Sequence, residues 1–184
     1  MVKARVIVFG CTHDIQRICP MFVPQSNIPR HRDQQRTFAK TLARLVTEEN
    51  VYFIGEEIGY SEPSIVHDVA NALGVLYSRI DMPLAERIRR GCPGSYEVLF
   101  AAEGRDGEVE ACHRLREEYM AQRAAEFLAD DQTGLIVCGE RHAEGICAQL
   151  VRFVQTVQRR SVADFSWFDR ALYRWDRLVS GATV

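Results

Sequence analysis

The chain has 184 residues, of which 47% are hydrophobic, so it is long enough to form a single domain with a sizeable core. Its formal net charge of −2 excludes the strongly basic surface that nucleic-acid binding requires. The chain has no apolar run near the roughly 18 residues of a membrane-spanning helix and no leader-peptide pattern at its start, so we expect a cytoplasmic protein.

Strand and helix patterns alternate through the first half of the chain. Runs of β-branched residues predict strands, and apolar residues three to four positions apart predict helices. One helix carries the further signature of a proline at its start, Pro63, and a glycine at its end, Gly74. In chain order we expect a strand over 6–9, a loop over 20–32, a helix over 33–50, a strand over 51–54, a helix over 63–74 and a strand over 75–80.

The second half continues the alternation. It predicts a short helix within 83–94, a long helix over 109–129, a strand over 135–138, a helix from 142 to 154 and a helical extension over 155–184. The aromatic residues of that extension suit either the core or the face of a homodimer. We therefore expect one α/β domain over 1–184, with a mainly parallel central sheet flanked by helices in a three-layer sandwich.

Two of the predicted strands end in the same pattern of glycine, two residues and histidine. It runs from Gly10 to His13 after the first strand and from Gly139 to His142 after the last. The carboxyl ends of parallel strands meet at one edge of a sheet, where ligands bind. We therefore expect His13 and His142 to meet in one pocket.

Acidic residues follow the strands between these two patterns. Glu56 and Glu57 come after the strand over 51–54, and Asp81 comes after the strand over 75–80. Successive side chains of an extended segment point in opposite directions, so only one of Glu56 and Glu57 is expected to face the pocket.

Imidazole and carboxylate groups together suit a divalent ion such as Mn, Co or Zn, which would activate a water molecule and polarise a carbonyl group. We expect the metal ligands to be His13, His142 and one of the two glutamates, assigned as Glu56 with Glu57 as the alternative. The other acid, Glu57 in this assignment, or Asp81 would move protons. Without a metal, the same set would work as a histidine base oriented by a carboxylate.

These motifs, in this order, resemble the TraB/Tiki/ChaN/erythromycin-esterase superfamily over most of residues 5–150. The likeness is closest in two segments. Residues 116–121 are similar to the Arg-acid-x-x-Met-Ala pattern of that superfamily, and residues 137–146 are similar to its Gly-x-x-His-x-x-Gly-Ile pattern.

The resemblance implies a cleft over the sheet that gathers His13, His142, an acid matching Glu56 or Glu57, and Arg116, which would steady developing negative charge. Members similar to Tiki are metal-dependent peptidases, those similar to erythromycin esterase hydrolyse a lactone with a histidine base, and those similar to ChaN bind haem. The predicted function is a metal-dependent or histidine-base hydrolase of an ester, lactone or amide-type bond in a small molecule or peptide.

Two other functions fit the same residues. A non-catalytic module would use the cleft to bind haem or another ligand, and a thiol enzyme would use Cys11, two residues before His13. The six cysteines include no C-x-x-C pair, so we expect free thiols rather than disulfides. Cys112 and His113 are expected on a helix surface.

Overall fold

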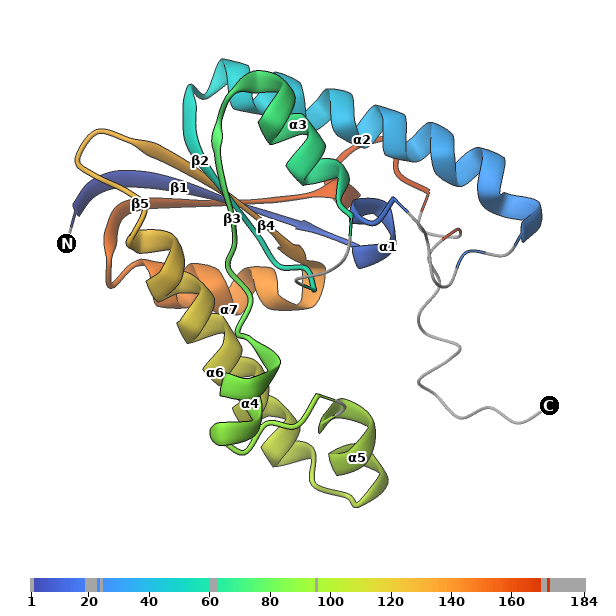
Figure 1. Ribbon diagram of the computed structural model, residues 1–184, viewed down its shortest axis with the longest axis vertical. Coiled ribbons are helices and arrows are strands. Elements are labelled where there is room, and N and C mark those ends of the chain that lie inside the picture. Colours follow the sequence, from blue (N-terminus) through green and yellow to red (C-terminus); the bar gives the residue numbers. More distant parts are fainter. Residues whose placement is uncertain are drawn as a thin grey trace.

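The computed structural model describes residues 2–18, 23, 25–59, 63–94, 96–169 and 172, and these residues form a five-stranded, entirely parallel sheet (Figure 1). The strands are β1 (Val2–Cys11), β2 (Val51–Glu56), β3 (Leu76–Arg79), β4 (Thr133–Gly139) and β5 (Val154–Ser161). Their order across the sheet is β3-β2-β4-β1-β5. The predicted α/β class with a parallel central sheet is confirmed.

Helices cover both faces of the sheet and complete the three layers (Figure 1). One face carries α2 (Ile28–Glu48) and α3 (Ile65–Leu73), and the other carries α6 (Asp106–Ala125) and α7 (Glu140–Leu150). The single turn α1 (His13–Gln16) follows β1, and α4 (Leu84–Arg89) and α5 (Tyr96–Ala102) lie beside the part of α6 that extends beyond the sheet. None of the described helices is long and apolar enough to cross a membrane.

Side chains of the central strands alternate between two hydrophobic cores. On β1, Ile7 and Phe9 pack with α2 and α3, whereas Val6 and Val8 pack with α6 and α7. All four residues are fully buried. Burying a side chain of this size contributes about 1.5–3 kcal/mol, so β1 is stabilised from both faces. The same alternation decides which face each residue at a strand end addresses.

Helix α2 begins at Ile28, not at residue 33 as the sequence predicted. Pro29 lies in its first turn, where a missing N–H costs no helical hydrogen bond. The residues before 33 therefore extend the helix, and His31 is buried.

The predicted helical extension over 155–184 is wrong at its start, because residues 154–161 form β5. Thr156 and Val157 are β-branched, which favours strands, and they pair with Arg5 and Val6 at the edge of β1.

The aromatic residues after β5 pack on the core. Phe165, Trp167 and Phe168 are partly buried against the cluster beneath α2 and α3. These contacts agree with the core role that the sequence allowed, and the homodimer role stays a prediction. Residues 173–184 of the predicted extension lie outside the described part of the chain.

Cys92 and Cys112 form a disulfide, so the prediction of free thiols is wrong for this pair. The bridge joins the segment after α4 to α6, with a Cα–Cα distance of 5.5 Å. Cys112 and His113 are buried, not on the helix surface as the sequence predicted. Nothing in the cysteine spacing shows which helices will pack together, and the pairing depends on that contact.

Candidate functional site

His13 and His142 lie at the same end of the sheet. They follow the neighbouring strands β1 and β4, whose register sets Cys11 beside Gly139. His13 begins α1, and His142 lies in the first turn of α7. Their Nε2 atoms lie 3.8 Å and 3.4 Å from the same oxygen, Oε1 of Glu57. The structure therefore brings both predicted histidines to one carboxylate.

The adjacent acids Glu56, the last residue of β2, and Glu57 point to different surroundings, as strand alternation requires. Glu57 is directed toward α6 and α7. Glu56 is directed toward α3, where it accepts hydrogen bonds from Ser64 Oγ at 2.7 Å and from the Tyr77 hydroxyl at 2.6 Å. The sequence left open which glutamate joins the histidines and assigned Glu56, whereas Glu57 is the one that lies beside both histidines in the structure.

Arg116 reaches from α6 to Glu57 and engages all five of its N–H groups. Nε and Nη2 donate to Asp81 at 3.0–3.1 Å, and Nη2 also donates to Glu57 Oε1 at 2.7 Å. Nη1 lies 3.3 Å from both the Tyr96 hydroxyl and His142 Nε2. The resemblance implied an arginine that steadies charge on the substrate. In the structure its N–H groups are bonded within the protein, so Arg116 links Glu57, Asp81, Tyr96 and His142.

Asp81 anchors this arginine. Its carboxylate faces Nε and Nη2 of Arg116 and also accepts the N–H of Met82 at 2.8 Å. A second guanidinium, that of Arg87, lies 3.6 Å away. These contacts suit a fixed anion better than the proton-moving group expected from the sequence.

Glu57 is a buried carboxylate whose charge is compensated on several sides. Burial raises its pKa, but the charges of His142, His13 and Arg116 and the N–H of Gly139 lower it further, to about 2. The Gly139 N–H donates to Oε2 at 2.9 Å. Glu57 therefore remains ionised at neutral pH and provides a fixed negative charge for both imidazoles.

His13 is the most exposed ionisable side chain around Glu57. Its side chain is 29% exposed, against 1% for Glu57, 5% for His142 and 10% for Arg116. Its Nδ1 lies 2.7 Å from Gln16 Oε1. An amide oxygen only accepts, so Nδ1 carries a hydrogen, and in the neutral imidazole the lone pair lies on Nε2.

The orientation of His13 is supported from the other face of the sheet. Gln16 Nε2 donates to Glu56 Oε1 at 3.3 Å, so the buried Glu56 fixes which way the Gln16 amide points. The chain Glu56, Gln16, His13 resembles the orienting arrangement of a histidine base, with an amide inserted between acid and imidazole.

His142 is held by a different acid. Its Nδ1 lies 3.0 Å from Glu117 Oε1, so Nδ1 carries a hydrogen and Nε2 accepts from Arg116. Burial lowers the pKa of His142, but the charge of Glu57 and the hydrogen bond to Glu117 raise it above its usual value. His142 is therefore a buried imidazole that can take up a proton.

Gly139 is required by the close approach of these groups. A Cβ at this position would stand 2.9 Å from His13 Nε2 and 3.5 Å from Glu57 Oε2. Any larger residue would push the imidazole away from the carboxylate, which explains the glycine of the second histidine pattern.

The side-chain atoms around Glu57 that could ligate a divalent metal do not fit one. The guanidinium of Arg116 already donates to Glu57 Oε1 and to His142 Nε2, the atoms that would bind the ion, and its permanent charge repels a cation. Within the described parts of the chain, no three His, Cys, Asp or Glu side chains are arranged to hold a metal.

Cys11 is not arranged as a nucleophile. It is 1% exposed, and burial, followed by the charges of Glu56, Glu57 and Glu140, raises the pKa of its thiol well above the usual value. A thiol in such surroundings stays protonated and inert. The alternative of a Cys11-centred thiol enzyme has no support in this geometry.

Several residues of the site were not singled out from the sequence. They hold the predicted residues in place: Gln16 and Ser64 act on the Glu56 side, and Tyr96 and Glu117 act on the Arg116 side. Of these, Glu117 could have been found from the sequence, because it is the acid that follows Arg116 in the motif over residues 116–121.

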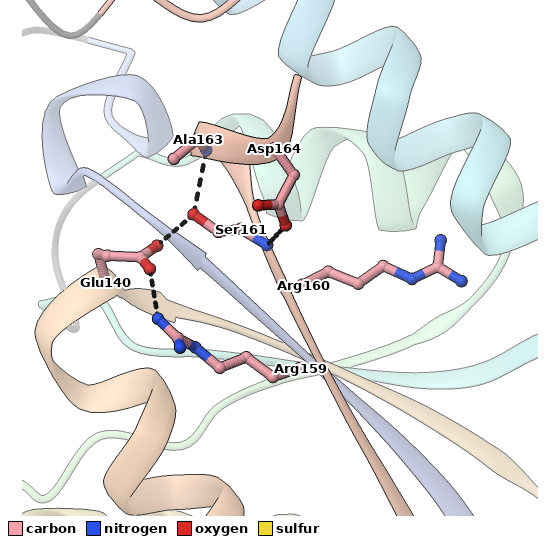
Figure 2. Close-up of a pocket in the computed structure, with 6 residues that line it drawn as sticks. All are labelled: Glu140, Arg159, Arg160, Ser161, Ala163 and Asp164. Atoms are coloured by element: carbon pink, nitrogen blue, oxygen red, sulfur yellow. Dashed lines mark hydrogen bonds and ion pairs between the residues drawn. The ribbon is translucent and has the colours of Figure 1, made fainter. Parts of the chain in front are cut away.

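A separate polar pocket of about 360 Å³ opens beside β5 (Figure 2). It is lined by Glu140, Arg159, Arg160, Ser161, Ala163 and Asp164. Arg159 pairs with Glu140 at 2.7 Å, and Arg160 extends away from it to pair with Glu49 at 2.6 Å. Both guanidinium groups are thus paired with carboxylates, and the pocket contains none of the predicted site residues.

Comparison with known proteins gives no relative for this site. No protein-family model, no curated protein and no solved structure matches the chain.

Proposed function

We propose that the protein is a hydrolase of an ester, lactone or amide-type bond that uses His13 as its general base. The observation that carries this proposal is the environment of His13. Its imidazole is the more exposed of the two beside Glu57. Its Nδ1 hydrogen is donated to Gln16, and its Nε2 faces the ionised Glu57 at 3.8 Å.

The chemistry follows from these positions. His13 Nε2 takes a proton from a water molecule as the water oxygen attacks the carbonyl carbon of the substrate. The imidazolium formed lies beside Glu57, which stabilises its charge. The proton on Nε2 then passes to the leaving oxygen or nitrogen as the bond to the carbonyl carbon breaks, and this restores neutral His13.

The buried residues keep Glu57 ionised and in position. Arg116 binds it at 2.7 Å and is itself fixed by Asp81, while His142 approaches the same oxygen at 3.4 Å. No step in this mechanism requires a metal, so the metal-dependent form of the predicted hydrolase is not the one that we propose.

The test measures hydrolysis of p-nitrophenyl esters, alkyl lactones and short peptide amides by chelator-treated protein. We expect turnover of at least one class, and a loss in kcat/KM of about 10²- to 10⁴-fold in His13→Ala. His67→Ala is the matched control, because the His67 side chain is 50% exposed on α3, and it should retain activity within about twofold.

A protein that turns over none of these probes would contradict the proposal. If haem then produced a Soret band, or a small ligand raised the melting temperature, the site around Glu57 would belong to a non-catalytic binding module.

If the protein is cytoplasmic, as the sequence predicts, the Cys92–Cys112 disulfide would lie in a reducing compartment. Disulfides are rare there and are mostly redox-sensing or catalytic. The thiol content of freshly isolated protein would show whether the bridge persists in the cell.

A further inference from the structure

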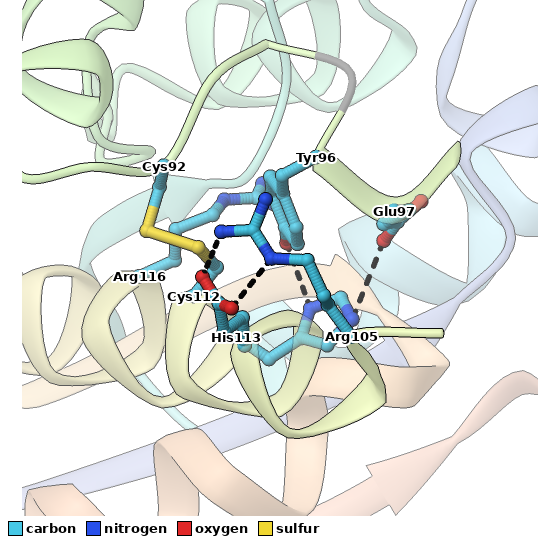
Figure 3. Close-up of a disulfide and its surroundings, with 8 residues drawn as sticks. Cys92, Tyr96, Glu97, Arg105, Cys112, His113 and Arg116 are labelled. Carbon is cyan, nitrogen blue, oxygen red and sulfur yellow. Dashed lines mark hydrogen bonds and ion pairs between the residues drawn. A yellow bond between two sulfur atoms is a disulfide. The ribbon is translucent and has the colours of Figure 1, made fainter. Parts of the chain in front are cut away.

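The disulfide lies next to two residues that support Arg116. Cys92 precedes Tyr96, the first residue of α5, and Cys112 precedes His113 in α6. All four are between 2% and 3% exposed. Figure 3 shows the bridge beside Tyr96, His113 and Arg116.

Tyr96 and His113 extend the hydrogen bonds of Arg116 in one direction. A guanidinium only donates, so the Tyr96 oxygen accepts from Nη1 of Arg116 at 3.3 Å. The Tyr96 hydrogen is then left for His113 Nδ1, 2.8 Å away. His113 must accept at Nδ1 and carry its hydrogen on Nε2, which lies 3.4 Å from Glu97.

The protonation state of His113 agrees with this direction of hydrogen-bond donation. Burial, followed by the charges of His142 and Arg141, lowers its pKa to about 4 against the opposing charges of Glu97 and Glu110. His113 is therefore neutral at physiological pH, as an acceptor of the Tyr96 hydroxyl must be.

Tyr96 holds one end of the Arg116 fork. The other end is fixed by Asp81 and Glu57, whereas Nη1 contacts only Tyr96 and His142 among the described residues. Without the phenol oxygen, rotation about the Cζ–Nη1 bond would be less restricted, and the hydrogen bond from Nη1 to His142 would weaken.

The bridge determines where Tyr96 sits. The segment between α4 and α6 packs as a small cluster of its own, made of Cys92, Tyr96, Phe100, Val109 and Cys112 with Leu115 against it. This cluster is separate from the two cores beside the sheet. The disulfide is therefore the covalent link that keeps Tyr96 against α6.

We propose that Tyr96 is a positioning residue for Arg116, and that the Cys92–Cys112 disulfide holds it there, so that reduction of the bridge loosens the site. A dithiol reductant supplies two electrons and two protons. The S–S bond becomes two thiols, and the reductant closes into its own disulfide. The effect on catalysis rests on the proposed function, whereas the effect on Arg116 does not.

The decisive measurement is the nitrogen NMR spectrum of protein labelled with ¹⁵N-arginine. Restricted rotation should give Arg116 separately resolved Nη signals, identified by their loss in Arg116→Lys. We expect Tyr96→Phe to broaden or merge the Nη signals while the Nε signal, bonded to Asp81, persists. The Cys92→Ser/Cys112→Ser double variant should give the same change.

Reduction of the unmodified protein with dithiothreitol is the second route to the same state, and it needs no variant that must fold without the bridge. It should free two thiols per chain and reproduce the Tyr96→Phe spectrum. Cys147→Ser is the matched control, because Cys147 is free and half-buried, and it should leave the Arg116 signals unchanged.

Unaltered Nη signals in Tyr96→Phe would overturn the positioning role. A changed spectrum in Tyr96→Phe with an unchanged spectrum in reduced protein would overturn the role of the disulfide. With an active ester probe, both changes should lower kcat by roughly 10- to 100-fold at constant KM. If no probe is turned over, the proposed function fails while the spectra still decide this inference.

Discussion

Gly145 of α7 lies directly against the carboxylate of Glu117 in α6, so that a Cβ at position 145 would overlap the carboxylate carbon and both of its oxygens. Glu117 in turn fixes Nδ1 of His142 at 3.0 Å. The glycine that follows His142 in the motif therefore makes room for the acid that orients this histidine.

Gly145→Ala should disturb the site more than the fold. The new methyl group displaces Glu117 from His142, while alanine in place of glycine returns up to about 1 kcal/mol of helix stability. We expect a melting temperature within a few degrees of the parent and a clear loss of hydrolysis. Gly107→Ala in α6, where a Cβ meets nothing within 4 Å, should leave activity intact. Equal activity in the two variants would show that Glu117 is not needed.

The ionised state of Glu57 should make the protein sensitive to acid. Its pKa is about 2 in the folded protein and about 4.3 in an unfolded chain. Its contribution to stability is thus complete above about pH 4.3 and is lost as the pH falls toward 2, on the order of 3 kcal/mol. Urea unfolding between pH 5 and 2 measures this slope. Glu57→Gln should be less stable at pH 7 but flatter over this range, and parallel curves would exclude the assignment.

Ser64 should matter for both α3 and Glu56. Its Oγ accepts the N–H groups of Val66 and His67 and donates to Glu56. Ser64→Ala removes a helix cap worth about 1 kcal/mol and a hydrogen bond to a buried carboxylate worth about 1–3 kcal/mol. We expect a loss of roughly 2–4 kcal/mol in denaturant unfolding.

The matched control for Ser64 is Ser161, which caps the short helix Val162–Asp164 and donates to Glu140. Glu140 is 37% exposed, so water can replace the lost hydroxyl. Ser161→Ala should therefore cost less than Ser64→Ala, and the reverse order would contradict the role of Glu56 as a buried anion.

Removal of divalent ions should leave the protein unchanged. Arg116 already engages the Glu57 and His142 atoms that would ligate an ion. Dialysis against EDTA should therefore shift the melting temperature by less than about 1 °C and leave esterase activity intact. Metal analysis of purified protein should find far less than one ion per chain. One tightly held ion that is lost in His142→Ala would restore the metal-dependent hypothesis.

The sequence was sufficient for β1 to β4 and for the convergence of the two histidines, but it missed the edge strand β5. Both depend on local patterns, namely β-branched runs that end in glycine. It was insufficient for the choice between Glu56 and Glu57, because that choice depends on the position of β2 relative to the helices on each face.

Part of the Arg116 environment could be predicted from the sequence. In α6 the buried stripe includes Met120, Ala121 and Ala124, and the same spacing continued toward the start of the helix passes through Arg116 and Glu117. Charged residues on the apolar stripe of a helix indicate buried partners. Tyr96 carried no such signal, because it reaches Arg116 only through the disulfide-linked packing of α5.

The side-by-side register of β1 and β4 has an evolutionary consequence. With Gly10 opposite Cys138 and Cys11 opposite Gly139, the two histidine turns leave the sheet at nearly the same level. Adding or deleting one residue in either strand would rotate everything beyond it to the opposite side. Length changes in one strand would thus have to be accompanied by changes in the other.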